Sequence, residues 1–319
     1  MKKLTCILAV SLLLLILTAC DDNAGSATTT QTEPVNQATE TQNRPTVDRE
    51  GHTLSLPDEI NSIVSIGPSV TEMLVALGFA DIIIQTDVHS ADISGLQPDI
   101  STLEMFALDF ERVIDLNPDI VFIIGMTRVE GDEDPLRMVS DTGISVVYMP
   151  TSTALADIKE DIRFMASVME VDSIGDSIVA DMTNEIERIR AIGESISERR
   201  TVYFEISPAP HMFSFGTGTF LNEIIGIVGA VNIFADQDGW ISVSDEVLID
   251  ANPDVIITSI NFMDDPVGEI INRPGWDSIT AVQDGKVFQV STNYTNRPSH
   301  NVVRGMQQIA RAIYPDYFQ

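Results

Sequence analysis

The order of apolar and polar positions early in the chain predicts strands that alternate with short helices. Residues 63–66 are β-branched except for one serine and predict a strand. A Gly-Pro turn follows, and apolar residues then recur at helical spacing until Gly78. Ser69 precedes Glu72 by three positions, the spacing of a capping box, so we expect these side chains to cap the helix.

More strands are predicted in the first half of the chain. They are "DIIIQT" at 81–86, "IVFII" at 120–124 and "ISVVYM" at 144–149. Asp109 can cap the intervening helix "FERVIDL", and Pro118 follows that helix. Because strands separated by short helices form βα units, the pattern predicts an α/β fold with parallel sheets.

A long helix without strands is predicted next. The segment from about 154 to 196 contains no proline, and its apolar residues recur at intervals of three and four. A helix of roughly 24 residues would run about 36 Å, a length that suits a rigid spacer between two lobes. The stripe that we expect to be buried consists of Ile174, Ile178, Met182, Ile186 and Ile189.

After Arg200 the alternation of strands and helices resumes. Strands are predicted at "TVYFEIS", "VIITSI" and "KVFQV", and helices at "FLNEIIGIVG", "SDEVLIDA" and near 300–313. The first strand is followed by a glycine-rich turn, "FGTGT". The second half of the chain therefore has the same organisation as the first.

Two phrases occur once in each half. "ERVIDLNPDIVFIIG" begins at Glu111, and "EVLIDANPDVIITSI" begins at Glu246. Each predicts a helix that Pro stops and a strand that follows, with Asn and Asp bonding the local backbone. Glu72 and Glu223 also precede Gly78 and Gly229 by the same six residues, and we expect each glutamate to cap or complement its own helix. The repeats predict two equivalent lobes that face a cleft, a favoured place for small ligands.

The composition limits the partners of the protein. The 319 residues include 48 acidic and 18 basic side chains, for a net charge of −30. This charge repels nucleic acid and anionic lipid headgroups, so we expect neither as a partner. A hydrophobic fraction of 44% with 6% aromatic residues is typical of a soluble α/β protein.

The first residues have the pattern of an export signal. "MKKLTCILAVSLLLLILTAC" has a basic start and a short apolar run, which predicts a signal peptide at 1–19. Its end resembles the lipobox of bacterial lipoproteins, which implies that Cys20 is lipidated. The segment 20–46 is rich in Thr, Gln and Asn and predicts a disordered tether. We expect an extracytoplasmic protein that contacts the membrane only through its lipid, on a Gram-positive surface or a periplasmic face.

These patterns together divide the mature chain into three segments. We expect an N-terminal α/β lobe at 47–152, a helical segment with the interlobe helix at 153–199, and a C-terminal α/β lobe at 200–319. Because Cys6 would leave with the signal peptide, no internal disulfide is expected.

Several blocks of the sequence resemble a known family. "IVSIGPSVTEMLVALG", "FERVIDLNPDIVFI", "GTFLNEIIGIVGAVNIF" and "GWISVSDEVLIDANPDVII" are similar to the helical-backbone (class III) substrate-binding lipoproteins of ABC importers for cobalamin, ferric siderophores and haem. The resemblance covers 47–319. It implies two Rossmann-like lobes joined by one long helix, a ligand cleft between the lobes, and a permease with its ATPase as partners. We also expect a monomer without cofactor and without enzymatic activity.

The resemblance assigns a role to the repeated glutamates. Glu111 and Glu246 match the exposed residue of each lobe that pairs with permease arginines in the family. The alternative is that both only complement their own helix dipole at the first turn.

The loops after the strands supply candidates for the cleft. Trp240 matches a family tryptophan that covers flat ligands, and an indole face suits a corrin or porphyrin ring. The alternative is a partly buried structural Trp, and Trp276 is expected to pack at a turn. The ligand-binding candidates are Pro68, Ser69, His89, Met126, Arg128, His211, Phe213, Trp240 and Arg297.

Other cleft positions depart from the cobalamin binders. Those proteins have Tyr or Trp where this chain has "TDVHS" and "GMTRV". Arg128 and Arg297 could meet a carboxylate or the oxygens of a ferric chelate, or each could neutralise a nearby Asp. The resemblance and the charged positions together favour an iron–siderophore or corrinoid as the ligand.

Metal and enzyme chemistry have weaker support in the sequence. The four histidines are widely separated, so no metal site is expected, although His89 or His211 could be an axial haem ligand. No G-x-S-x-G, P-loop or dinucleotide fingerprint is evident. A haem or direct metal-ion receptor of the same fold remains an alternative, followed by a surface sensor or an enzyme.

Overall fold

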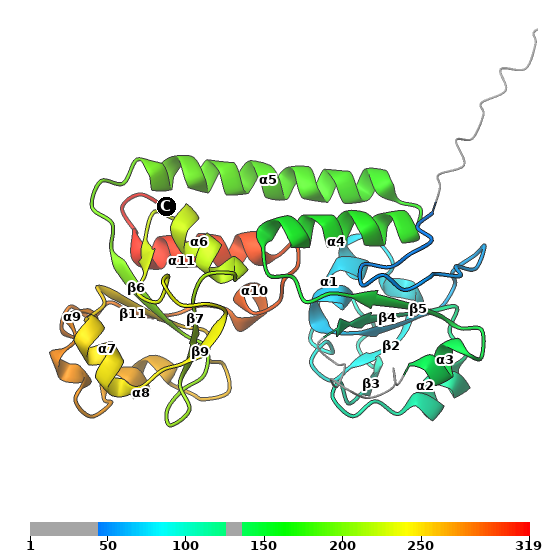
Figure 1. Ribbon diagram of the computed structural model, residues 1–319, viewed down its shortest axis with the longest axis horizontal. Coiled ribbons are helices and arrows are strands. Elements are labelled where there is room, and N and C mark those ends of the chain that lie inside the picture. Colours follow the sequence, from blue (N-terminus) through cyan, green and yellow to red (C-terminus); the bar gives the residue numbers. More distant parts are fainter. Residues whose placement is uncertain (1–43, 126–135) are drawn as a thin grey trace, which may run out of the picture. The chain divides into compact units, whose positions relative to one another are not determined.

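The computed structural model describes residues 44–125 and 136–319. These described residues belong to one compact unit. The predicted signal peptide, Cys20, Met126 and Arg128 lie outside them. The predicted lobe boundaries stay predictions, but two separate parallel sheets are present, as Figure 1 shows.

The first sheet has the strand order β3-β2-β1-β4-β5, and all its strands are parallel. Its strands are β1 (Ile63–Ile66), β2 (Ile83–Asp87), β3 (Ser101–Leu103), β4 (Ile120–Ile124) and β5 (Ser145–Met149). Its helices are α1 (Pro68–Ala76), α2 (Phe110–Leu116), α3 (Arg137–Ser140) and α4 (Leu155–Val168), with a 3₁₀ turn at Ala80–Ile82. The α/β prediction is confirmed, and β4 and β5 are buried at every position.

The second sheet has the order β11-β10-β6-β8 and is also parallel. Its strands are β6 (Thr201–Glu205), β8 (Val231–Asn232), β10 (Val255–Thr258) and β11 (Val287–Gln289). An antiparallel pair, β7 (Phe213–Phe215) and β9 (Trp240–Ser242), lies beside it. The helices are α6 (Phe220–Ile227), α7 (Asp245–Ala251), α8 (Pro266–Ile271), α9 (Thr280–Gln283), α10 (Thr292–Thr295) and α11 (Val302–Ile313), with a 3₁₀ turn at Trp276–Ser278.

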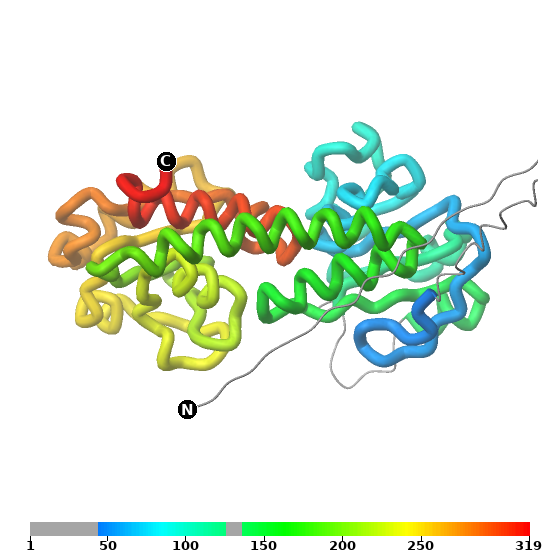
Figure 2. Tube along the Cα trace, turned by 90° about the horizontal axis from the view of Figure 1, so that it is seen from above, coloured from blue at the N-terminus to red at the C-terminus, as the bar shows by residue number. Residues whose placement is uncertain are grey.

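One long helix connects the two sheets, as predicted. Helix α5 (Asp172–Glu194) has 23 residues and lies beside α4 at one end and α11 at the other (Figures 1 and 2). Its buried residues are Gly175, Val179, Met182, Ile186, Ile189 and Gly193.

The predicted stripe of α5 is therefore right in its second half and displaced by one residue in its first. Ile174, expected to be buried, is 42% exposed. Gly175 instead lies against α4, where an added Cβ would come within 2.5 Å of the Ala166 Cβ. This contact between small residues brings α4 and α5 close together. The buried face of α5 therefore includes Gly175 and Val179 in place of Ile174 and Ile178.

The repeated Asn residues end their helices in the same way. Asn117 follows α2 and Asn252 follows α7, with left-handed φ values of 45° and 43°. Asn tolerates this conformation better than most residues, and the Pro that follows cannot continue the helix.

The prediction that the repeated Asp residues, Asp119 and Asp254, bond the local backbone is wrong. They reach a neighbouring strand instead. One Asp119 oxygen accepts bonds from the Ser62 amide at 2.9 Å and its hydroxyl at 3.0 Å, just before β1. One Asp254 oxygen accepts bonds from the Thr201 amide at 2.7 Å and its hydroxyl at 2.8 Å, at the start of β6. Each Asp thus fixes the register of a central strand pair.

Two hydrophobic cores lie on opposite faces of the second sheet. Val202 and Phe204 of β6 point into a large core that continues through α5 to the first sheet. Tyr203, between them, points into a smaller core with Leu248 and Trp276. This division follows from the alternation of side chains along a strand.

Candidate ligand-binding site

A cavity of about 380 Å³ lies where the carboxyl ends of both sheets meet. Residues after β1, β2, β3 and β5 line it on one side, and residues after β6 and in the second lobe line it on the other. Ligands of parallel α/β folds bind at this edge of the sheet, so the position follows from the topology. The lining residues are Pro68, Ser69, His89, Met105, Phe106, Ile124, Thr151, Ser152, Thr153, Ile206, Gly218, Thr219, Phe220, Trp240, Asn296, Arg297 and Pro298.

Two aromatic side chains on this cavity are open to solvent. Phe106 follows β3 and is 68% exposed, and Trp240 begins β9 and is 54% exposed. The Trp240 ring packs edge-on against the buried Phe215, with ring centroids 6.2 Å apart, and this contact fixes the orientation of the indole. Both rings therefore present apolar surface on a concave part of the molecule.

A buried aspartate organises the first-lobe side of the cavity. One Asp87 oxygen accepts the Gly67 amide at 2.8 Å and the Ser90 hydroxyl at 2.5 Å, and the other accepts the His89 amide at 2.9 Å. Gly67 has φ of 122°, and an added Cβ would meet the Ile124 side chain at 2.7 Å. This glycine is therefore required where the backbone passes the end of β4. Asp87 thus positions the loops that carry Ser69 and His89.

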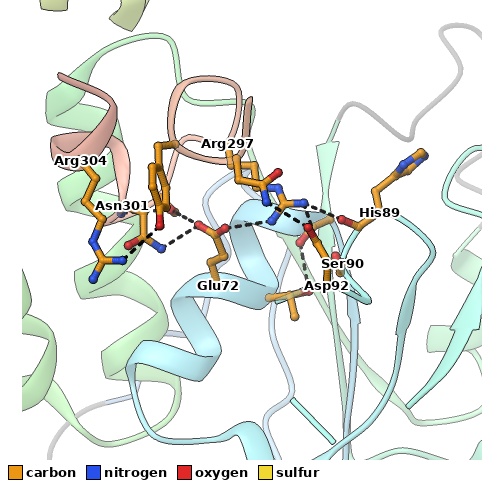
Figure 3. A network of polar contacts seen from close by, with 12 residues as sticks. Glu72, His89, Ser90, Asp92, Arg297, Asn301 and Arg304 are labelled. Atoms are coloured by element: carbon orange, nitrogen blue, oxygen red, sulfur yellow. Dashed lines mark hydrogen bonds and ion pairs between the residues drawn. The ribbon is translucent and has the colours of Figure 1, made fainter. Parts of the chain in front are cut away.

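Arg297 lines the cavity but is already paired. Its guanidinium contacts Glu72 at 3.1 Å and Asp92 at 2.9 Å (Figure 3). Burial works to raise the pKa of Asp92, but hydrogen bonds from Arg297 and Asn293 outweigh it and hold this pKa below its usual range. Of the two predicted roles for Arg297, the structure contains the ion pair with nearby carboxylates.

The prediction that Ser69 and Glu72 cap α1 is wrong. The helix begins at Pro68, its N-cap is Gly67, and no side chain caps it. Because Pro occupies the first helical position, Ser69 lies inside the helix. The Glu72 carboxylate instead bonds Arg297 and Ser299 of the second lobe.

Glu223 does not cap its own helix either, but it lies in the first turn of α6, where an acid complements the helix dipole. The Thr219 hydroxyl caps α6 by accepting the Asn222 amide at 3.3 Å. One Glu223 oxygen accepts the Leu155 amide at 3.1 Å, at the first residue of α4. Glu72 and Glu223 therefore each form a hydrogen bond from one lobe to the other.

The structure brings some of the predicted ligand residues together and separates others. Pro68, Ser69, His89, Trp240 and Arg297 all line the cavity. His211 and Phe213 are exposed but are not among the residues that line it. Ligand contact at these two residues stays a prediction.

Trp276 packs at a turn, as expected. It is fully buried, its indole donates to Asp245 at 2.7 Å, and the Arg273 guanidinium lies 4.2 Å from its ring centre. Arg273 in turn pairs with the buried Glu205 at 2.7 Å. Burial raises the pKa of Glu205, and the bonds from Arg273 oppose this rise only in part.

Sequence reasoning missed part of the lining. Phe106 was missed because β3 has only three residues and no alternating pattern, so the loop after it gave no signal. Residues 151–153 directly follow the predicted strand at 144–149, and the rule that ligands bind at carboxyl ends of strands would have found them.

Metal ligands are not clustered in the part of the chain that the structure describes. Within residues 44–125 and 136–319, no group of three or more His, Cys, Asp and Glu residues is placed to hold a metal ion. The same ranges include no helix long and apolar enough to cross a membrane.

The repeated glutamates lie on the surface of both lobes. Glu111 is in the first turn of α2 and Glu246 in the first turn of α7, and both are exposed. Neither forms a described ion pair. Their equivalent placement follows from the repeated sequence.

Comparison with known proteins places this geometry in a family. Residues 63–294 match a family model described as periplasmic binding protein. The chain belongs to the periplasmic binding protein family. Periplasmic binding proteins of this kind are the substrate-binding components of ABC transporters, which work with a permease and an ATPase. The chain is therefore a binding component of such a transporter and not an enzyme.

Individual periplasmic binding proteins differ in ligand. The uncharacterized ABC transporter substrate-binding lipoprotein YvrC of Bacillus subtilis is 27% identical and aligns over 85% of this chain and 86% of its own length. A vitamin B12-binding protein of Pectobacterium carotovorum is 27% identical, and the alignment covers 79% of this chain and 87% of that protein. The structure of the molybdate-binding protein MolA of Haemophilus influenzae has a TM-score of 0.73 at 22% identity, over 86% and 92% of the two chains. The MolA likeness shows the shared two-lobed fold alone.

Proposed function

We propose that this periplasmic binding protein carries an iron–siderophore or corrinoid complex in its cavity and delivers it to the permease of an ABC importer. The observation that carries the proposal is the exposure of Phe106 and Trp240 on the cavity wall. Both rings offer flat apolar surface, and a chelate with an apolar rim or macrocycle would cover them. The vitamin B12-binding relative supports the same class of ligand.

The charge of the site favours neutral or cationic complexes. Within the described lining, Arg297 is the one permanent cation, and Glu72 and Asp92 already offset it. The whole chain has a net charge of −30, which repels anions at longer range. A corrinoid or ferric hydroxamate fits these conditions better than a ferric catecholate with several negative charges.

Haem is the second candidate, because of one side chain. His89 lies on the cavity wall with its ring centre 6.3 Å from that of Phe106. A single imidazole can ligate haem iron, and the neighbouring ring could pack on a porphyrin. A bare metal ion has less support, since it needs several convergent ligands.

Location and docking complete the proposal. Cys20 would carry the lipid that holds the protein at the outer face of the cell membrane, on a Gram-positive surface or in a periplasm. Glu111 and Glu246 would bind arginines of the permease, one from each lobe. A monomer presents both glutamates to a two-fold partner.

Tryptophan fluorescence of the full chain, purified in mild detergent, tests the ligand class. We expect one among ferric hydroxamates, ferric catecholates, cobinamide, cobalamin and haemin to quench the emission saturably. Trp240→Phe would remove most of that quenching, because Trp276 is buried away from the cavity. Phe106→Ala should weaken binding by about 2 kcal/mol, roughly thirtyfold, because it removes one of the two exposed rings of the cavity wall.

The matched control is Phe262→Ala. Phe262 is 73% exposed but does not line the cavity, so its removal should leave affinity unchanged. Equal losses in Phe106→Ala and Phe262→Ala, or no binding of any of these compounds, would contradict the proposal.

A further inference from the structure

Glu72 connects the two lobes through a buried carboxylate. It lies in α1 of the first lobe and is 6% exposed. One oxygen accepts a bond from Arg297 Nη1 at 3.1 Å. The other accepts bonds from Ser299 Oγ and from Asn301 Nδ2, the latter at 3.2 Å (Figure 3). All three donors belong to the segment between α10 and α11, so one side chain holds that segment of the second lobe.

The other terminal nitrogen of Arg297, Nη2, also bonds residues of the first lobe. Nη2 donates to Asp92 Oδ1 at 2.9 Å and to the His89 carbonyl at 2.9 Å. A terminal guanidinium nitrogen has two hydrogens, so both are used. The Arg297 side chain is 13% exposed. It therefore acts as a cross-link from the second lobe to two elements of the first.

The cross-link forms part of the cavity wall. Asn296, Arg297 and Pro298 line the cavity, and so does Ser69, three residues before Glu72. A guanidinium at this place without its carboxylates would attract carboxylate or phenolate oxygens of a ligand. With Glu72 and Asp92 bound to it, the same wall has no net positive charge.

A second crossing provides an internal comparison. Glu223, at the equivalent place in the second lobe, accepts the Leu155 amide at the start of α4. It is exposed and does not contact Arg297. Both glutamates bond from a helix of one lobe to the other lobe, but only the contact of Glu72 includes Arg297, which lines the cavity.

We propose that Glu72 is a specificity-determining positioning residue. Together with Asp92 it holds Arg297 as a tie between the lobes, and so withdraws this arginine from the binding of anionic ligands. The cavity then favours neutral and cationic complexes over anions. The specificity part rests on the proposed function, whereas the tie between the lobes does not.

Hydrogen exchange of the full chain in detergent tests the tie without a ligand. Glu72→Gln keeps the size of the side chain but removes its charge, so we expect faster exchange in 89–96 and 296–301. Glu223→Gln is the matched control, and these two segments should exchange in it as in the wild type. Unchanged exchange of both segments in Glu72→Gln would overturn the proposal, whatever the ligand measurements give.

Ligand titration tests the specificity. The ferric tris-catecholate trianion should bind Glu72→Gln about tenfold more tightly than the wild type, equivalent to about 1.4 kcal/mol. The double variant Glu72→Gln/Arg297→Gln should lose this gain, and neutral cyanocobalamin should change by less than about threefold, well under that energy.

No gain in trianion affinity in Glu72→Gln, while the wild type binds one of the chelates, would overturn the role of Glu72 in specificity. Failure of every chelate to bind the wild type would overturn the proposed function instead, and the exchange measurement would still decide whether the tie exists.

Discussion

The role of a glutamate in this chain depends on what its neighbours already bind. Glu223 is free to reach Leu155 because the Thr219 hydroxyl caps α6. Glu72 is free to reach Arg297 because α1 begins at a proline and has no side-chain cap. Sequence spacing alone does not distinguish a cap from a contact with another lobe, since both place a carboxylate in the first turns of a helix.

His300 makes stability depend on pH near the Glu72 crossing. Burial lowers the pKa of His300, the neighbouring Glu72 opposes this, and Arg304 adds to it. Because the folded pKa lies below the unfolded value of 6.5, the unfolded state binds more protons as pH falls. Stability contributed here is therefore complete above about pH 6.5 and is lost as pH falls through the folded pKa.

Thermal unfolding at pH 7 and at pH 5 measures this effect. His300→Gln removes the titrating group, so we expect its melting temperature to fall less than that of the wild type between these two values. His211→Gln, which removes an exposed imidazole, controls for the loss of a histidine as such. Parallel pH profiles for His300→Gln and the wild type would contradict the assignment.

At the level of elements, the contact of α5 with α6 requires a glycine. An added Cβ at Gly193 would come within 2.2 Å of the Ile227 carbonyl oxygen and 2.9 Å of the Gly229 nitrogen. These are backbone atoms, so relief requires movement of a whole helix. We expect Gly193→Ala to lower the free energy of unfolding by about 1–3 kcal/mol through overpacking.

Gly226→Ala in α6 is the matched control. No atom lies within 4 Å of a Cβ added there, so alanine gains helix propensity without a clash. We expect an increase in stability of up to about 1 kcal/mol. Denaturant unfolding of both variants decides the point, and a stable Gly193→Ala protein would show that the helices can separate without cost.

Patterns long enough to bury a face were predictable from the sequence. β1, β4 and β5 and the helices α2, α5 and α11 all lie at their predicted places, since each has a continuous apolar run or stripe. Short elements such as β3 and α3 have too few positions to show a period.

The cavity was predictable by topology but not in detail. Loops after predicted strands supplied Ser69, His89 and Trp240, and all three line it. Phe106 could not be found, because its loop follows β3, which has only three residues and shows no alternating pattern. The partners of Arg297 could not be found either, because Glu72 is more than 200 positions away in the chain and no local rule connects them.

At the scale of the whole molecule, function requires two lobes to engage one permease. We predict that the double reversal Glu111→Arg/Glu246→Arg abolishes uptake in cells while the purified protein keeps its ligand affinity. Both glutamates are exposed and outside the cavity lining, so their reversal should not disturb the site. Uptake assays beside ligand titration test this.

Reversal of exposed Glu187 on α5 is a suitable control, because it changes the charge away from α2 and α7. Loss of ligand affinity in the double variant would mean that the two glutamates serve the cavity. Unimpaired uptake would leave them as acids that complement their helix dipoles.

The two cores on the faces of the second sheet have a consequence for how the protein unfolds. The large core is continuous from the first sheet through α5 to Val202 and Phe204, whereas the smaller one contains Tyr203, Leu248 and Trp276. Cooperative units follow continuous packing, so they need not coincide with the lobes. We therefore expect the layer with α7 to open as a separate foldon while the lobes stay joined, which would place Glu246 on the less protected of the two units.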